Sequence, residues 1–427
     1  MPPKSSPNNT ARILRLLYPG IRIKRWLFLG MAGVIISSVG ATFYFRRLID
    51  QKFPEFLSNY AEPPMAIMGL IIGLIIILLA LAGLYKTFKP LLIGNPAIGE
   101  IGFTLYRRRH LQRGPRIVAL GGGTGMSVLL SGLKNHTDNL TAIIGVSDDG
   151  GSSGRLRREL GVLPPGDFRN CIVAMSDEES LLPELLQYRF TDGEGLKGHS
   201  FGNLFLVAMS NVTSSFESAL SESSKVLAVR GTVLPATTNN LKLSAKMTSG
   251  DIVHGESNIT QSSNVVDTLY INPPTVEAFQ PAVEAIMNAD IVVMGPGSLY
   301  TSILPNLMVN GIQEAILETK AIKFYVCNVA TESGETNGYD VLDHVKALLR
   351  HTHTDMIDIV IANDNLQDVG PNFQSESVKM EREYDIDQVV SSGDLIDESH
   401  PIRHDSNKLS KFIIDKYGKT NLRSIRH

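Results

Sequence analysis

Cysteine is almost absent from this sequence, which holds Cys171 and Cys327 and no others. Each lies alone in an apolar run, so the sequence has neither a disulfide framework nor a cysteine spacing typical of a metal site. Isolated cysteines of this kind are usually small buried hydrophobic residues, and their scarcity is typical of a protein in a reducing compartment.

A strong charge of one sign is also missing, because 40 basic and 43 acidic side chains leave a net charge of −3. General nucleic-acid binding needs a large positive surface, so no nucleic-acid partner is expected. Hydrophobic residues make up 43% of the 427 residues, which is ample for a large core.

Charged residues are missing from two long stretches near the N-terminus, residues 26–45 and 65–85. Each has about 20 residues, enough to cross the ~30 Å apolar core of a bilayer as a helix. A signal peptide would have a shorter apolar core and no second stretch after it, and a buried soluble hairpin would show a polar face. The sequence therefore predicts two transmembrane helices.

Basic residues lie before the first of these helices and after the second, whereas the loop 46–64 balances its basic residues with acidic ones. The positive-inside rule then predicts a cytoplasmic segment 1–25, a periplasmic loop 46–64 and a cytoplasmic C-terminal domain in the inner membrane. A basic linker, 86–114, follows the second helix. Its run 107–113 fits contact with anionic lipid and a solvated linker equally well.

From residue 115 the sequence alternates between strand-like and helix-like segments. The strand-like segments are 116–120, 141–147, 291–295, 322–328 and 358–362, and the helix-like segments are about 126–134, 167–190, 201–227, 276–288 and 339–350. Such alternation predicts a Rossmann-like α/β domain over residues 115–427, with a parallel sheet and helices on both faces. Residues 229–272, where apolar residues alternate with Thr, Ser and Asn, predict a small inserted antiparallel subdomain.

Four loops follow these strands directly: GGGTG at Gly121–Gly125, SDDGGSSG at Ser147–Gly154, GPGS at Gly295–Ser298 and NVATESGETNG at Asn328–Gly338. The carboxyl ends of parallel strands lie along one edge of a sheet, where ligands bind. We therefore expect the four loops to converge on one site.

The GGGTG loop does not match the common nucleotide fingerprints. A redox dinucleotide motif, G-x-G-x-x-G, would need a small residue where Met126 or Val128 stands, so neither NAD nor FAD is expected. No P-loop string occurs in the chain. The remaining interpretations are a turn whose amides hold a phosphate or diphosphate, and a purely structural tight turn.

The second loop contains a G-x-S-x-G string at Gly150–Gly154, which raises the possibility of an esterase with Ser152 as nucleophile. Asp148 and Asp149 stand immediately before it, where a hydrolase elbow would continue the strand. Adjacent carboxylates at a strand end more naturally hold Mg²⁺ or bond sugar hydroxyls. A solvated turn is the alternative.

Several long stretches carry a resemblance. They are RIVALGGGTGMSVLLSGLK, VSDDGGSSGRLRRELGVLPPGDFRNCIVAMSD, GHSFGNLFLVAM, VVMGPGSLYTSILPNL and, near the C-terminus, IRHDSNKLSKFI. Together they resemble the gluconeogenesis-factor family, the CofD-like bacterial relatives of 2-phospho-L-lactate transferase. The similarity starts near residue 115 and leaves out the membrane hairpin, which many members of the family lack.

The resemblance implies which residues form the ligand site. Those expected to hold the diphosphate of a nucleotide are Gly121, Gly122, Gly123, Thr124, Gly125, Gly295, Pro296, Gly297, Ser298, Tyr300 and Thr301. Asp148 and Asp149 match an acidic pair that supports Mg²⁺ and the acceptor in the transferases, and they would be catalytic only in such an enzyme.

Further pocket positions in the resemblance are Asp167, Arg169, Asn170, His199 and Asn203. A helix N-cap is the structural alternative for Asp167, and a capping histidine is the alternative for His199.

The function that the resemblance implies is binding of UDP-sugars such as UDP-N-acetylglucosamine, linked to cell shape, wall synthesis and gluconeogenic carbon metabolism. Transferase relatives instead move phospholactate from a guanosine diphosphate carrier to a deazaflavin alcohol. The string DDGGSSGRLRREL is more similar to the regulator branch. The leading hypothesis is a membrane-anchored, cytoplasm-facing UDP-sugar-binding regulator, followed by the transferase and then the esterase. Turnover, protein partners and a homo-oligomeric state stay open.

Overall fold

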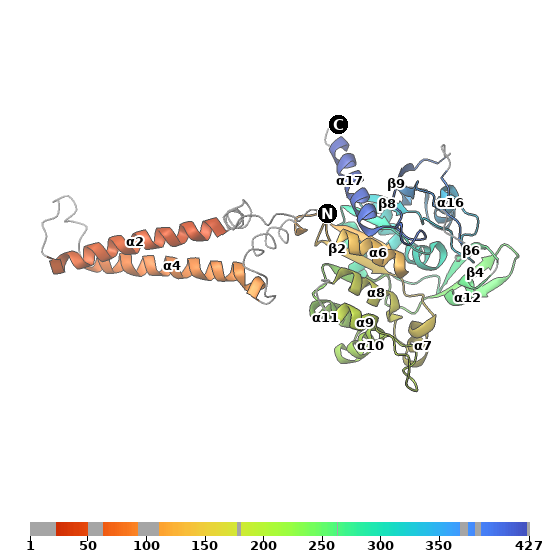
Figure 1. Ribbon diagram of the computed structural model, residues 1–427, viewed down its shortest axis with the longest axis horizontal. Helices are drawn as coiled ribbons and strands as arrows, with labels where there is room; N and C mark the ends of the chain where they lie inside the picture. Colours follow the sequence, from red (N-terminus) through yellow and green to blue (C-terminus); the bar gives the residue numbers. More distant parts are fainter. Residues whose placement is uncertain are drawn as a thin grey trace. The chain divides into compact units, whose positions relative to one another are not determined.

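The computed structural model describes residues 23–49, 63–92, 111–176, 181–262, 264–367, 375–380 and 386–424 (Figure 1). The chain divides into two compact units, Met1–His110 and Leu111–His427. Each unit has its own packing.

The first unit contains two helices, α2 (Ile23–Ile49) and α4 (Pro63–Leu92), which pack against each other as an antiparallel pair. Glycines let the two backbones approach closely. A β-carbon on Gly33 would lie 2.9 Å from the carbonyl oxygen of Gly73, and one on Gly40 would lie 2.8 Å from the amide nitrogen of Leu70. Close contact of this kind is typical of helices that pack in lipid, where small residues line the interface.

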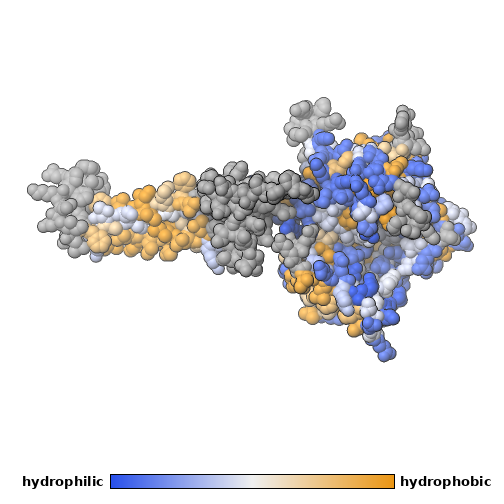
Figure 2. All heavy atoms as spheres, viewed as in Figure 1, coloured by the Kyte–Doolittle hydropathy of each residue, from blue (hydrophilic) through white to orange (hydrophobic). Residues whose placement is uncertain are grey.

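Both helices are covered by hydrophobic side chains on their outer surface (Figure 2). By length and composition, Arg25–Phe45 and Pro64–Lys86 could each cross a membrane. These spans include the predicted stretches 26–45 and 65–85. Both helices also run several residues beyond those stretches, into the predicted loop and linker. The rest of the predicted segments 1–25, 46–64 and 86–114 lies largely outside the described residues.

The second unit is built on a seven-stranded sheet with the order β10-β9-β8-β7-β1-β2-β3. Its strands are β1 (Ile117–Gly121), β2 (Leu140–Ile144), β3 (Thr232–Pro235), β7 (Ile291–Met294), β8 (Ile322–Val326), β9 (Ile359–Asn363) and β10 (Val389–Gly393). Every neighbouring pair is parallel. The central strands are continuous apolar runs buried along their length, as in a sheet covered on both faces. The predicted α/β fold is confirmed.

Helices connect the strands on both faces of the sheet (Figure 1). Between β1 and β3 lie α6 (Gly123–Leu133), α7 (Gly151–Leu160), α8 (Pro165–Met175), α9 (Leu182–Gln187), α10 (Phe201–Thr213) and α11 (Phe216–Val226). From Gln280 onward lie α13 (Gln280–Met287), the π-helical turn η2 (Leu299–Ile303), α14 (Leu304–Leu307), α15 (Ile312–Glu318), α16 (Val341–His351), the 3-10 turn η3 (Thr354–Met356) and α17 (Ser406–Ser424).

The long helices predicted at 167–190 and 201–227 are each divided in two. In the second case α10 ends at Thr213, and the C-cap residue Ser214 that follows has a positive φ of 64°. Ser215 then starts α11 by accepting a hydrogen bond from the amide of Ser218. The apolar period continues across the break, so the sequence pattern alone does not reveal it.

A smaller antiparallel sheet, with the order β5-β4-β6, consists of β4 (Lys242–Met247), β5 (Ile252–His254) and β6 (Val266–Asn272), and α12 (Glu256–Thr260) packs against it. The inserted subdomain predicted at 229–272 is therefore present. The prediction is wrong for β3, which pairs in parallel with β2 and forms an edge of the main sheet. Four residues are too few to show whether a strand belongs to a parallel or an antiparallel sheet.

The strand order places β1 beside β7 at the centre of the sheet. From β1 the chain moves outward through β2 and β3, and from β7 it moves outward in the opposite direction through β8, β9 and β10. With right-handed crossovers the helices of the two halves lie on opposite faces. The crevice for a ligand is therefore expected at the carboxyl ends of β1 and β7, where GGGTG and GPGS begin.

Candidate functional site

The two glycine turns at the centre of the sheet pack directly on each other. A β-carbon on Gly125 would lie 2.7 Å from the carbonyl oxygen of Pro296, and one on Gly297 would lie 3.2 Å from the carbonyl oxygen of Gly122. Gly123 differs, because it has a φ of +67° and its β-carbon would have only the Ser302 hydroxyl within 4 Å. Gly125 thus allows the two turns to pack closely, and Gly123 allows the positive φ of the backbone.

The first turn forms the N-terminus of α6, where amides have no acceptor within the helix. The amide of Gly123 donates to the carboxylate of Asp167. The next two residues, Thr124 and Gly125, line a cavity. Their position at a helix N-terminus is suited to an anionic ligand.

Two amides in and just after the second turn are already bonded to the protein. The amide of Gly297 donates to Oδ1 of Asn328 at 3.1 Å, and the amide of Tyr300 donates to Oε2 of Glu335 at 3.0 Å. The GPGS turn therefore shapes the site by close packing, and the first turn of α6 is the better amide source for an anion.

The cavity beside Thr124 has a volume of about 210 Å³. Its lining consists of Thr124, Gly125, Val128, Pro296, Gly297, Asn328, Val329, Ala330, Thr331, Glu332, Ser375, Ile402, Arg403 and His404. Half of these residues are apolar or glycine and half are polar or charged, including one arginine, and such a mixture can form a small-molecule site. We call this space the α6 cavity.

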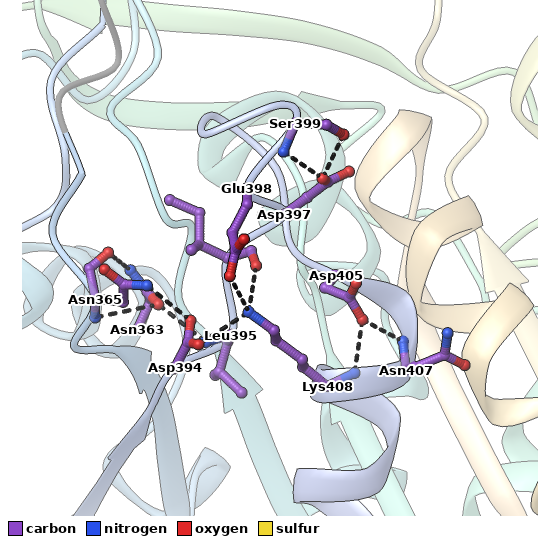
Figure 3. A network of polar contacts seen from close by, with 11 residues as sticks. Asn363, Asn365, Asp394, Leu395, Asp397, Glu398, Ser399, Asp405, Asn407 and Lys408 are labelled. Carbon is purple, nitrogen blue, oxygen red and sulfur yellow. Dashed lines mark hydrogen bonds and ion pairs between the residues drawn. The ribbon is translucent and has the colours of Figure 1, made fainter. Parts of the chain in front are cut away.

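Arg403 and His404 reach the α6 cavity on the segment between β10 and α17. A polar network fixes this segment (Figure 3). Asp405 accepts hydrogen bonds from two amides of the first turn of α17, and Lys408 bonds Asp394 at 2.9 Å. The arginine and histidine are therefore held in place from both ends of the segment.

A cluster of partly buried carboxyl groups lies near the glycine turns and does not line the α6 cavity. Burial, followed by the charge of Asp148, raises the pKa of Asp167 to about 6. Burial also raises the pKa of Asp148 and places that of Glu256 well above its usual range. Ser147 donates to Glu256 at 2.8 Å. Raised pKa values at a strand-end loop are typical of a functional site.

The adjacent carboxylates Asp148 and Asp149 have different partners. Asp148 accepts from the amide of Gly150 at 2.9 Å. Asp149 accepts from the amides of Glu256 and Ser257, at 3.1 and 2.9 Å, and from the Ser257 hydroxyl at 2.7 Å, so it holds the start of α12. The two carboxylates do not form a paired metal clamp.

Among the described residues, no group of three or more His, Cys, Asp or Glu side chains is arranged to hold a metal ion. A Mg²⁺ ion at Asp148 and Asp149, which the family resemblance implies, stays a prediction.

The alternative interpretation of Asp167, as a helix N-cap residue, is wrong for its own helix. The N-cap residue of α8 is Pro164, with no side-chain cap, and Asp167 instead bonds the N-terminus of a different helix, α6. A β-carbon on Gly122 would collide with the Asp167 carboxylate. The Asp167 carboxylate therefore packs against the GGGTG turn and bonds its backbone.

Arg169 organises the remaining predicted pocket residues. Its guanidinium donates to the Ser200 hydroxyl, to Oδ1 of Asn203 at 3.1 Å and to Oδ1 of Asn170 at 2.7 Å. Its Nε is buried and has no partner in the described part of the chain. The structure thus brings Arg169, Asn170 and Asn203 together as one network.

His199 lies beside Ser152, with 2.9 Å between Nδ1 and the serine Oγ, and Asn203 donates to the same oxygen at 3.1 Å. The capping interpretation of His199 is wrong, because Ser200 caps α10. A histidine therefore lies within hydrogen-bonding reach of Ser152, the nucleophile of the esterase hypothesis. However, no carboxylate hydrogen-bonds His199 in the described residues, and Ser152 is only 6% exposed. A catalytic triad is not formed.

Tyr300 and Thr301 direct their side chains to protein partners. The Tyr300 hydroxyl lies 2.9 Å from that of Tyr339, and Thr301 donates to Oε1 of Glu335 at 2.7 Å. Neither residue lines the α6 cavity. Their contribution in this structure is to hold the turn after GPGS.

Sequence reasoning missed the acidic residues of the loop after β8. Burial, followed by the charge of Glu332, raises the pKa of Glu335 to about 8, and burial raises that of Glu332, which lines the α6 cavity. The sequence predicts that Asn328–Gly338 follows a strand at the ligand-binding edge, but it does not indicate which residues of this loop reach the site. Arg403 and His404 were likewise part of the IRHD stretch without being assigned to the site.

Comparison with known proteins identifies the family. Residues 117–410 match the family model described as 2-phospho-L-lactate transferase CofD. A gluconeogenesis factor of Bacillus subtilis is 44% identical over 70% of this chain and 98% of its own length. A relative from Clostridium acetobutylicum is 40% identical over 93% of this chain and 90% of its own length.

A solved structure agrees with this result. The crystal structure of a UPF0052-family protein from Bacillus halodurans has a TM-score of 0.68 and 42% identity, and the match covers 71% of this chain and all of the other. The chain belongs to the CofD family and is similar, over its α/β domain, to proteins described as gluconeogenesis factors.

Proposed function

We propose that this protein is a membrane-anchored regulator that binds a nucleotide sugar, of the UDP-N-acetylglucosamine type, and links it to cell-wall and central carbon metabolism. The observation that carries the proposal is the α6 cavity at the switch point of the sheet. There Thr124 and Gly125, in the first turn of α6, and Arg403 line the same small cavity. Helix amides and arginine are the usual partners of a diphosphate.

Two groups of residues near the glycine turns suit the two ends of such a ligand. The α6 cavity has apolar walls that fit a nucleoside. The carboxylate of Asp148 and the Arg169 network, which do not line this cavity, are hydrogen-bonding groups of the kind that bind sugar hydroxyls. The diphosphate would then lie over the first turn of α6.

A transferase of the 2-phospho-L-lactate type is the alternative, and the buried carboxylates favour it as a candidate. Asp148 and Asp167 are close enough for the charge of one to raise the pKa of the other. Such a pair is suited to orienting an acceptor hydroxyl. Any Mg²⁺ would be held partly by the ligand's phosphates, because Asp149 is already used at α12. Transfer of phospholactate by the purified protein would establish this alternative.

Replacing Arg403 tests the proposed binding site. Calorimetric titration of the full-length protein in lipid nanodiscs should show binding of UDP-N-acetylglucosamine without its consumption. Arg403→Gln should weaken binding by about tenfold or more, because one charge-assisted hydrogen bond is lost. The matched control is Arg350→Gln, since Arg350 is paired with Asp267 at 3.3 Å outside the α6 cavity. Equal affinity of all three proteins would refute the site.

The membrane topology gives a second prediction. Helices α2 and α4 are joined by a short connection, and the Clostridium match covers more of this chain than the α/β unit alone, so it extends into the hairpin. A reporter fused after His427 should be cytoplasmic, and one inserted near Ser58 should be periplasmic, because the basic flanks favour the inside. Protease cleavage of the C-terminus in sealed spheroplasts would contradict this orientation.

A further inference from the structure

Two arginine side chains lie against the backbone just before His199. The guanidinium of Arg155, on α7, donates to the carbonyl oxygen of Lys197 at 3.1 Å, and that of Arg189 donates to the carbonyl oxygen of Gly198 at 2.6 Å. Gly198 has a φ of +84°, and a β-carbon there would lie 2.9 Å from Nη2 of Arg155. The two guanidiniums are thus held on consecutive carbonyl groups.

Neither arginine has an acidic partner. In the described part of the chain Arg155 and Arg189 form no ion pair with a carboxylate. Each uses a single nitrogen in the hydrogen bonds above. Burial, followed by the charge of Arg155, lowers the pKa of His199; the charge of Arg189 acts in the same direction and that of Glu159 opposes it. Neighbouring guanidiniums without acidic partners are typical of a site for an anion.

A chain of hydrogen bonds fixes the tautomer of His199. Arg169 donates to Oδ1 of Asn203, so the amide nitrogen of Asn203 is the group that donates to Oγ of Ser152. Among the described residues the only acceptor for the Ser152 hydroxyl is Nδ1 of His199, at 2.9 Å. Because Nδ1 accepts, the neutral ring carries its hydrogen on Nε2.

The N–H group at Nε2 of His199 is open to a ligand. Nε2 makes no hydrogen bond with the described residues, and it is not one of their fully buried unpaired atoms. It therefore reaches solvent, although the residue as a whole is only 4% exposed. His199 adds a third donor beside the carbonyl groups that hold the two arginines.

We infer that Arg155, Arg189 and Nε2 of His199 form a second anion site, which binds the phosphate group of a small phosphorylated molecule. Two guanidiniums and a ring N–H offer more donors than the two oxygens of a carboxylate can use, whereas a phosphate ester has three free oxygens and up to two charges. None of the three residues lines the α6 cavity. The inference goes beyond the proposed function, because it adds a ligand outside that cavity.

Titration with inorganic phosphate tests the second anion site. The full-length protein in lipid nanodiscs is titrated calorimetrically in phosphate-free buffer, with and without saturating UDP-N-acetylglucosamine. One phosphate should still bind when the nucleotide sugar is saturating, because the two sites do not overlap. Acetate should bind at least about tenfold more weakly, since a carboxylate has one charge and two oxygens.

Arginine variants assign the binding to these side chains. Arg155→Gln and Arg189→Gln should each weaken phosphate binding by about tenfold or more, because each removes charge-assisted hydrogen bonds. The matched control is Arg158→Gln, which makes the same change of charge on α7. The Arg158 guanidinium donates to the carbonyl oxygen of Asp149 at 3.0 Å, so its variant should bind phosphate like the unmodified protein. Thermal unfolding verifies that all three variants fold.

His199→Asn tests the third donor. The shorter side chain keeps an oxygen near the position of Nδ1 as an acceptor for Ser152, and it removes the N–H of Nε2. Phosphate binding should weaken by about threefold to tenfold. Unchanged phosphate affinity in this variant would overturn the assignment of the histidine.

The remaining outcomes separate this inference from the proposed function. Unchanged phosphate affinity in both Arg155→Gln and Arg189→Gln, or no phosphate binding at millimolar concentration, would overturn the inference. Displacement of phosphate by UDP-N-acetylglucosamine would assign the two arginines to the nucleotide sugar and also overturn it. A protein that binds phosphate but not UDP-N-acetylglucosamine would refute the proposed function and support the second anion site.

Discussion

Gly125→Val should lower the melting temperature of the α/β unit by about 4–5 °C and abolish nucleotide binding. A β-carbon at this position would lie 2.7 Å from the carbonyl oxygen of Pro296 and 3.1 Å from the amide nitrogen of Gly297. Both neighbours are backbone atoms of the other glycine turn, so relief requires the turns to separate. Overpacking of this kind costs about 3 kcal/mol, which corresponds to the stated temperature shift.

The matched control for Gly125→Val is Gly418→Ala. A β-carbon on Gly418, which lies in α17, would have no atom within 4 Å apart from its own stretch of helix. Alanine should therefore stabilise the helix by about 0.5–1 kcal/mol. Differential scanning calorimetry gives both values. A Gly125→Val protein that melts like the unmodified one would show that the two turns are not packed as described.

The fold could be predicted from the sequence because its signals are local. Strands β1 and β7 are uninterrupted apolar runs followed by glycine, and their alternation with helices indicates a parallel sheet. Strand β10 was missed because VVSSG is partly exposed at the sheet edge and carries little apolar signal. Edge strands with mixed polarity resemble loops in a single sequence.

The site could be predicted only to the level of loops. The convergence of GGGTG and GPGS follows from the sheet topology, and the structure places both at the switch point. Which side chain of a loop points into the site depends on distant segments. Asp148 and Asp149 are neighbours in the sequence, yet Asp149 bonds Ser257 at the start of α12, and nothing local indicates this contact.

The residues that sequence reasoning missed reach the site through tertiary packing. Arg403 lies far along the chain from the glycine turn and reaches the α6 cavity because the segment before α17 is fixed at Asp405 and Lys408. Tyr300 shows the opposite case. It closely follows GPGS, but its ring packs against His351 and its hydroxyl contacts Tyr339. In both cases, the distance along the chain from a glycine turn did not predict whether the residue lines the α6 cavity.

Asp167→Asn should strengthen diphosphate binding at pH 8 and remove most of its pH dependence between pH 8 and 6. The Asp167 carboxylate accepts the amide of Gly123 at the start of α6, so its negative charge lies where a diphosphate would bind. Its pKa is about 6 without ligand. A nearby diphosphate raises this pKa further, so binding takes up a proton and tightens as the pH falls toward 6. The gain is limited to about tenfold per pH unit for one proton.

Asp167→Asn should also change how the free energy of unfolding depends on pH. Because the pKa of Asp167 is raised in the folded protein from 3.8 to about 6, the stability associated with its protonated form is complete below pH 3.8 and is lost as the pH rises through 6. Asparagine keeps an oxygen for the Gly123 amide and carries no charge. Asp167→Asn should therefore be more stable than the unmodified protein at pH 8, by up to about 3 kcal/mol, and the difference should disappear near pH 4. Denaturant unfolding at both pH values measures it. Weaker binding at pH 8, together with unchanged stability, would instead make the Asp167 charge a direct ligand contact, as the family resemblance suggested.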